Sequence, residues 1–159
     1  MSVAQKEGHH AIIIFAGFAV INLDRDLEKI HHALLIAQRC ASAFTPGSIE
    51  VKRKTGGDPV TEADLVLNTT LKDVLLEGDD GWLSEETADD SKRLDKRRVW
   101  IVDPLDGTRE FVEGIPEWCI SIGLVIDGRP VAGGICNPAM NQIFVGSRES
   151  GIFLNGTKA

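Results

Sequence analysis

Two aspartates stand close together in residues 99–111, which read VWIVDPLDGTREF. Residues 99–102 are apolar and mostly β-branched, a pattern that predicts a strand buried on both faces and ending at Asp103. Pro104 cannot donate a hydrogen bond to a neighbouring strand, and Asp106 with the following glycine signals a turn before a polar run that could start a helix. We therefore expect the carboxylates of Asp103 and Asp106 to face one small space.

Carboxylates held close together repel each other, so that one becomes protonated or a cation lies between them. Mg2+ suits such a place because it prefers a few carboxylate oxygens, an occasional carbonyl and several waters; the Leu105 carbonyl is a candidate further ligand. Gly107 and Thr108 would offer backbone N–H groups and a hydroxyl to a phosphate at a helix start. On spacing alone, a polar turn with both aspartates solvated is the more common outcome.

The run DPLDGT at residues 103–108 resembles the signature of the inositol monophosphatase superfamily, whose members are metal-dependent, lithium-sensitive phosphomonoesterases. Residues 58–64 and the Glu85-Glu86 pair also resemble segments of that family. The resemblance implies a Mg2+ site formed by Glu85, Asp103, the Leu105 carbonyl and Asp106. It further implies that Glu85 and Thr108 orient the attacking water, that Asp64 supports Thr108, and that Gly107 and Thr108 bind phosphate.

Two of these residues have simpler interpretations when the resemblance is set aside. Asp64 lies in the first turns of a predicted helix, where a carboxylate favourably meets the helix dipole. Glu85 and Glu86 could belong to a solvated acidic loop, and adjacent side chains on an extended chain point to opposite faces, so only one of them reaches a given site.

The composition fits one soluble domain with a core, since the chain has 159 residues, of which 43% are hydrophobic and 26% charged. A net charge of −7 argues against a nucleic-acid backbone or an anionic membrane as partner. The family resemblance implies a small phosphorylated metabolite as the partner. The cysteines (Cys40, Cys119, Cys136) are scattered and no histidine follows His32, so we expect reduced core cysteines in a cytoplasmic protein and no cysteine nucleophile.

Hydrophobic periodicity predicts an α+β fold in which two helices pack on a mostly antiparallel sheet. The first helix starts at Asp24 and ends before Pro46, and the second runs over residues 58–77 with Asp58 as N-cap and Pro59 as its first residue. A short helical turn follows at residues 109–113. The expected strands cover residues 49–52, 82–86, 99–102, 118–126, 130–136, 142–146 and 152–154.

Two glycine-containing pairs have a specific expected role. Asp127 and Gly128 form a hairpin turn between two of the predicted strands. Gly133 and Gly134 lie in mid-strand and open no helix, so close backbone packing explains them better than a dinucleotide site.

Residues 1–23 are an N-terminal extension of unclear role, and residues 24–159 form the predicted domain. Residues 11–23 are apolar but too short to cross a bilayer, and neither a basic leader nor a clean cleavage site marks a signal peptide.

The resemblance covers the first half of the family's layered αβαβα sandwich. It implies that the second half, with a further metal-binding aspartate in a Trp-Asp motif, is absent from this sequence. We therefore expect fewer than the family's roughly two to three Mg2+ ions, weak activity of the isolated chain, and a homodimer or other association through an uncovered apolar sheet face.

Several functions stay open at this stage. The leading one is a Mg2+-dependent phosphomonoesterase of inositol monophosphatase type. Within the same superfamily, 3′(2′),5′-bisphosphate nucleotidases, histidinol-phosphatases and fructose-1,6-bisphosphatases compete, and Arg109-Glu110-Phe111 leans towards the nucleotidases. In a different class stands a truncated, non-catalytic domain that binds a metal or a partner.

Overall fold

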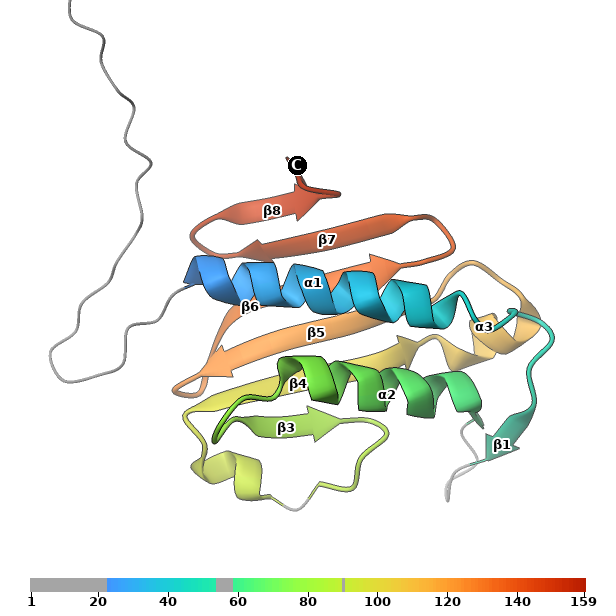
Figure 1. The fold of residues 1–159 in the computed structure, drawn as a ribbon, viewed down its shortest axis with the longest axis horizontal. Coiled ribbons are helices and arrows are strands. Elements are labelled where there is room, and N and C mark those ends of the chain that lie inside the picture. Colours follow the sequence, from blue (N-terminus) through green and yellow to red (C-terminus); the bar gives the residue numbers. More distant parts are fainter. Residues whose placement is uncertain (1–22, 54–58, 90) are drawn as a thin grey trace, which may run out of the picture.

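The computed structural model describes residues 23–53, 59–89 and 91–159. Helices α1 (Leu23–Ala41) and α2 (Glu62–Leu75) lie side by side on one face of a mostly antiparallel sheet (Figure 1). This arrangement confirms the predicted α+β class. The N-terminal extension, apart from Leu23, falls outside the described residues. No helix in the described part of the chain has the length and apolarity needed to cross a membrane.

Within the described residues, the main sheet has seven strands in the order β3-β4-β5-β6-β7-β8-β9. The strands are β3 (Gly81–Ser84), β4 (Arg98–Asp106), β5 (Cys119–Ile126), β6 (Arg129–Asn137), β7 (Gln142–Ser147), β8 (Gly151–Leu154) and β9 (Thr157–Lys158). β3 and β4 run parallel, and the other neighbours in this sheet pair antiparallel. The meander from β5 to β8 confirms the predicted strands, and positive φ angles of 50° at Asp127 and 73° at Gly128 confirm the hairpin turn.

Helix α1 packs on the sheet through its predicted apolar stripe. Ile30 and Leu34 are fully buried. A Cβ atom at Gly134 of β6 would lie 2.7 Å from Ile30 Cγ2 and 2.8 Å from Leu34 Cδ1, far inside van der Waals contact. A glycine at position 134 therefore lets the helix approach the strand, which confirms close packing as the reason for this residue.

The start of α2 differs from the prediction. Pro59–Thr61 is strand β2, which pairs with β1 (Val51–Arg53), and the helix begins at Glu62 with Thr61 as N-cap. Asp58, the predicted cap, lies outside the described residues. The fixed φ of proline also suits extended backbone in a short two-stranded ribbon, and the hydrogen bond from Thr61 N to Asp64 Oδ2 (2.7 Å) fixes the helix start later.

Other boundaries also differ from the prediction. β4 does not end at Asp103 but continues to Asp106, with a shift of register against β5 between these two residues. Ile101 is 42% exposed, so the expected burial of this strand on both faces was wrong, because both helices lie on the same face. α1 ends at Ala41 rather than near Pro46, β3 ends at Ser84 before Glu85, and a short 3-10 helix η1 (Lys92–Asp95) interrupts the charged connection.

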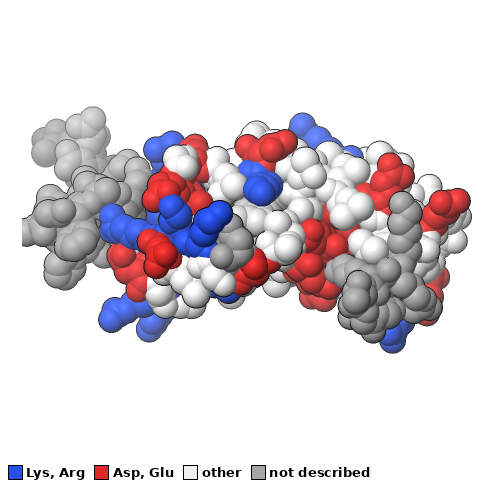
Figure 2. Space-filling model, turned by 90° about the horizontal axis from the view of Figure 1, so that it is seen from below, with Lys and Arg blue, Asp and Glu red and all other residues white. Residues whose placement is uncertain are grey.

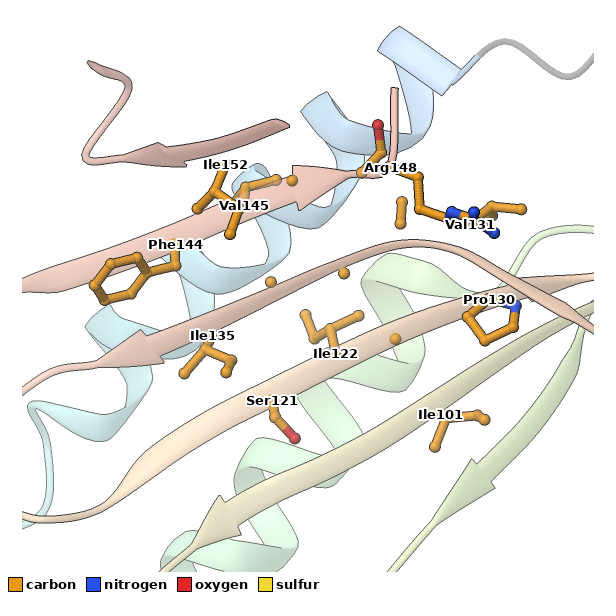
Figure 3. A pocket seen from close by; sticks show the side chains of 16 residues that line it. Ile101, Ser121, Ile122, Pro130, Val131, Ile135, Phe144, Val145, Arg148 and Ile152 are labelled. Carbon is orange, nitrogen blue, oxygen red and sulfur yellow. The ribbon is translucent and has the colours of Figure 1, made fainter. Parts of the chain in front are cut away.

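The face of the sheet opposite the helices is apolar and open, and we call it the open face. Strands β4 to β8 line a shallow groove of about 710 Å3 on it. Ile101, Ile135 and Ile152 in this groove are 42%, 46% and 57% exposed. Figure 3 shows these side chains on the side of the sheet away from α1 and α2.

Candidate active site

Two predicted site residues, Glu85 and Asp103, follow neighbouring parallel strands. Ser84, the last residue of β3, is in register with Val102 of β4. Parallel strands run in the same direction, so the residues that follow this pair, Glu85 and Asp103, lie at the same edge of the sheet. The parallel pairing of β3 with β4, which the sequence analysis did not anticipate, therefore brings two distant acidic segments together.

The carboxyl group of Asp103 lies in a strongly negative environment. Burial, the negative charges of Glu85 and Asp106, and a hydrogen bond with the Glu85 side chain raise the pKa of Asp103 to about 6, against a lowering effect of the Leu105 N–H. That N–H donates to Asp103 Oδ1 at 3.2 Å. Asp103 is half-buried, whereas Glu85 and Asp106 are exposed. The structure thus brings Glu85 and Asp106 close enough to Asp103 for their charges to act on its carboxyl group.

The turn after Asp106 opens helix α3 (Thr108–Glu113). Gly107 has a φ of +92°, and a Cβ atom there would lie 2.9 Å from the Glu117 carbonyl oxygen, so both conformation and space require glycine. The Thr108 hydroxyl lies 3.0 Å from the Leu105 carbonyl oxygen and 3.0 Å from Asp64 Oδ1. A hydroxyl carries one hydrogen, so it is shared between these acceptors, and its lone pairs remain available to a further donor.

Asp64 lies at the centre of this hydrogen-bonded group and is 1% exposed. Its Oδ2 atom accepts hydrogen bonds from the Thr61 N–H (2.7 Å) and the Thr61 hydroxyl (2.6 Å), while Oδ1 accepts from Thr108. The same carboxyl group therefore caps α2 and holds Thr108 in place. Its role exceeds the dipole compensation that its position in the helix suggested.

Comparison with known proteins now decides the family. The inositol monophosphatase family profile matches residues 19–159, which is most of the chain. The chain belongs to the inositol monophosphatase family.

The curated relatives are longer than this chain, and the aligned part is less than half of their length. An inositol monophosphatase of Mesembryanthemum crystallinum is 42% identical over 67% of this chain and 41% of its own length. A histidinol-phosphatase of Chlorobaculum parvum is 35% identical over 72% of this chain and 44% of its own. A solved IMPase/NADP phosphatase complexed with Mg2+ and phosphate shares the fold, with a TM-score of 0.76 at 22% identity over 86% of this chain and 52% of its own. The chain thus spans about half the length of the curated relatives it matches.

The donor atoms gathered here are of the kind that a hard divalent cation prefers. Glu85, Asp103 and Asp106 offer carboxylate oxygens. Burial, together with the charges of Glu85 and Asp106, raises the pKa of Asp103, and a cation would compensate the negative charge. In the described part of the chain, no group of three or more His, Cys, Asp or Glu side chains is arranged to hold an ion by itself. The residues present fit Mg2+ in donor chemistry, with the Leu105 carbonyl engaged by Thr108.

Two further residues lie beside the predicted set. Cys119 Sγ lies 3.9 Å from Asp106 Oδ2, and burial together with the charges of Asp106 and Asp103 raises the pKa of this thiol to about 11. The protonated thiol is a poor nucleophile, in agreement with the prediction that no cysteine acts as a nucleophile. The second residue, Asn68, was not predicted from the sequence. The one signal for it is its position four residues after Asp64, because side chains at positions i and i+4 share a helix face.

Proposed function

We propose that this chain carries the catalytic centre of a Mg2+-dependent phosphomonoesterase of inositol monophosphatase type. The observation that supports it most is the cluster of Glu85, Asp103 and Asp106 beside the Thr108 turn. Like charges gathered at one edge of a sheet are unfavourable without a cation, and they mark functional sites more often than structural ones. The proposed substrate is a small phosphorylated metabolite.

The residues divide the work of hydrolysis among them. Asp64 accepts the Thr108 hydrogen, so that a Thr108 lone pair accepts a hydrogen bond from the attacking water. Glu85 orients the same water and receives its proton as the water oxygen bonds to phosphorus. The bond from phosphorus to the ester oxygen breaks, the alcohol leaves with a proton from solvent, and Glu85 returns its proton to solvent. Bound Mg2+, held by Glu85, Asp103, Asp106 and the Leu105 carbonyl, would supply Lewis-acid stabilisation of the phosphate charge. On the family resemblance, we assign the backbone N–H groups of Gly107 and Thr108 to the phosphate oxygens.

An inositol phosphate is the first substrate to test, since the relatives include an inositol monophosphatase 42% identical to this chain. Histidinol phosphate is the second, because one relative of 35% identity is a histidinol-phosphatase. The Arg109-Glu110-Phe111 run keeps 3′(2′),5′-bisphosphate nucleotides as a third.

The open face is the proposed association surface. Ile101 and Asp103 are two residues apart on β4, opposite Gly123 and Ser121, so both side chains project to the open face. A polypeptide that covers the groove would thus border the carboxylates as well. We propose that a second copy or a separate polypeptide covers this face, and that the three free cysteines indicate a reducing, cytoplasmic compartment.

Phosphate release with Mg2+ tests the function. We expect the chain to release phosphate from inositol 1-phosphate, with inhibition by lithium, and Asp103→Asn to reduce the rate by about 100-fold or more, since even residues that only support metal ligands cost about 10–100-fold. Asp127→Asn, in the exposed hairpin turn, is the matched control. Absence of release together with a Mg2+-induced rise in melting temperature would favour the non-catalytic binding domain. Absence of both would overturn the proposal.

A further inference from the structure

The side chain of Asn68 connects helix α2 to the turn that carries Glu85. Ser84 Oγ donates a hydrogen bond to Asn68 Oδ1 at 2.7 Å. Asn68 Nδ2 donates in turn to Thr87 Oγ1 at 3.0 Å. The amide of Asn68 therefore bridges the residue before Glu85 and a residue two positions after it.

The same turn is closed by its own backbone, but weakly. The Thr87 N–H donates to the Ser84 carbonyl, and the Glu86 N–H donates to Ser84 Oγ, each at 3.3 Å. Ser84 is only 5% exposed. Since water hardly reaches its hydroxyl, Asn68 is the group that satisfies this donor and fixes its orientation.

Glu85 itself is exposed, so the packing of its own side chain does little to hold its position. It follows β3 at the same edge of the sheet as Asp103, and its negative charge helps raise the pKa of Asp103. The backbone of the Ser84–Thr87 turn must therefore direct Glu85 towards Asp103, and Asn68 holds that backbone.

Asn68 follows Asp64 by four residues, so both lie on the same face of α2. Asp64 holds Thr108, and Asn68 holds the Glu85 turn. We propose that Asn68 is a positioning residue that sets the distance between Glu85 and Asp103 and thereby the affinity of the site for a divalent cation. This inference rests on the proposed function of the carboxylate cluster.

The test uses Tb3+ bound to the full chain, measured by tryptophan-sensitised luminescence and competed with Mg2+. Asn68→Ala is expected to weaken Tb3+ binding about tenfold, the low end of the effect of residues that support metal ligands. Thr87→Val preserves side-chain shape, removes one acceptor and should give part of the same loss. Thr69→Ala is the matched control on α2, because the Thr69 hydroxyl donates to the Leu65 carbonyl of the same helix (3.0 Å).

A double-mutant cycle identifies the route of the effect. In a Glu85→Gln background, Asn68→Ala should change Tb3+ affinity less than twofold, because the residue it positions no longer carries the charge. The same tenfold loss in both backgrounds would overturn the inference, as would wild-type affinity in Asn68→Ala.

Amide hydrogen exchange keeps this test separate from the proposed function. Without metal, the Glu86 and Thr87 amides should exchange about tenfold faster in Asn68→Ala than in wild type or Thr69→Ala. Unchanged exchange would overturn the positioning role. If these amides respond but wild type binds no Tb3+ and releases no phosphate, the proposed function fails and Asn68 is reduced to a structural residue, which also overturns the inference.

Discussion

The two ends of strand β4 differ in how their charged side chains are paired. We call the end at Arg98, where charges of opposite sign pair, the balanced end, and the end at Asp103 and Asp106 the unbalanced end. At the first end, Arg98 Nη2 pairs with Asp26 Oδ1 at 2.8 Å and Nε with Asp80 Oδ1 at 3.4 Å. The Trp100 indole N–H donates to Asp80 at 2.9 Å, and the Arg98 guanidinium lies 5.8 Å from the Trp100 ring centroid. Although burial lowers the pKa of Arg98, its bonds to Asp26 and the charge of Asp80 outweigh this effect and leave the pKa above its ordinary value.

The other end of β4 gathers charge of one sign. In the described part of the chain, neither Asp103 nor Asp106 forms an ion pair with a lysine or arginine. Figure 2 shows a group of basic side chains at the end of the molecule where η1 lies, with acidic side chains also across the middle. Balanced charge therefore joins α1 to the sheet at one end, whereas unbalanced charge at the other is consistent with a site that binds a cation.

The largest expected change in stability comes from removing the ion pair of Arg98 at the balanced end. Arg98→Met should lower the free energy of unfolding by about 3 kcal/mol, because it leaves the buried Asp26 without its counter-charge. Arg97→Met, whose partner Asp127 lies on the exposed surface at 3.3 Å, is the control and should cost under about 1 kcal/mol. Urea unfolding measures both. Equal losses in the two variants would contradict the contrast between buried and exposed pairs.

Metal addition should stabilise the protein through the carboxylates of the unbalanced end alone. Mg2+ at about 100 times its dissociation constant should raise the free energy of unfolding by about 2.7 kcal/mol, and a chelator should reverse the gain. Arg98→Met should retain this increment, whereas Asp103→Asn should lose it. A Mg2+ increment of the same size in Asp103→Asn would remove Asp103 from the site.

Without metal, the unbalanced end should be more stable at acidic pH. The folded-state pKa of Asp103, about 6, lies above its ordinary value of 3.8. Its contribution is therefore fully present below pH 3.8 and lost as pH rises through 6. At pH 7 in chelator, Asp103→Asn should be more stable than wild type by about 1 kcal/mol, a value reduced for the half-exposed position. Chelator-treated melts from pH 4 to 7 measure this difference, and a constant difference would contradict the cluster.

The smallest expected effect lies at the exposed fringe of the balanced end. Glu77 pairs with Lys29 at 3.1 Å and with Arg25 at 3.4 Å, and Lys29 lowers its pKa through a hydrogen bond and its charge. The Glu77 side chain is 59% exposed. Glu77→Gln should therefore cost no more than about 0.5 kcal/mol, measured by the same urea titration at low salt. A loss as large as that of Arg98→Met would mean that solvent screens this pair less than its exposure indicates.

Local sequence patterns predicted most of the fold but not the pairing that builds the site. The apolar stripe of α1, the meander and the turn at Asp127 follow from periodicity and turn chemistry. The parallel pairing of β3 with β4 depends on contacts across residues 85–97, which no local pattern encodes. The Arg98 ion pairs and the role of Asn68 were missed for the same reason. Arg98 is 72 residues away from Asp26 in the sequence, and Asn68 is 16 residues away from Ser84.

The sharing of one carboxyl group between Thr61 and Thr108 has a thermodynamic consequence. Asp64 links the first turn of α2 to the hydroxyl that would face the attacking water. By linkage, if a ligand favours an intact first turn of α2 through the orientation of Thr108, the intact turn favours binding of that ligand by the same free energy. Protection of the backbone amides of that turn from hydrogen exchange would then report whether a ligand occupies the candidate site, without a probe in the site itself.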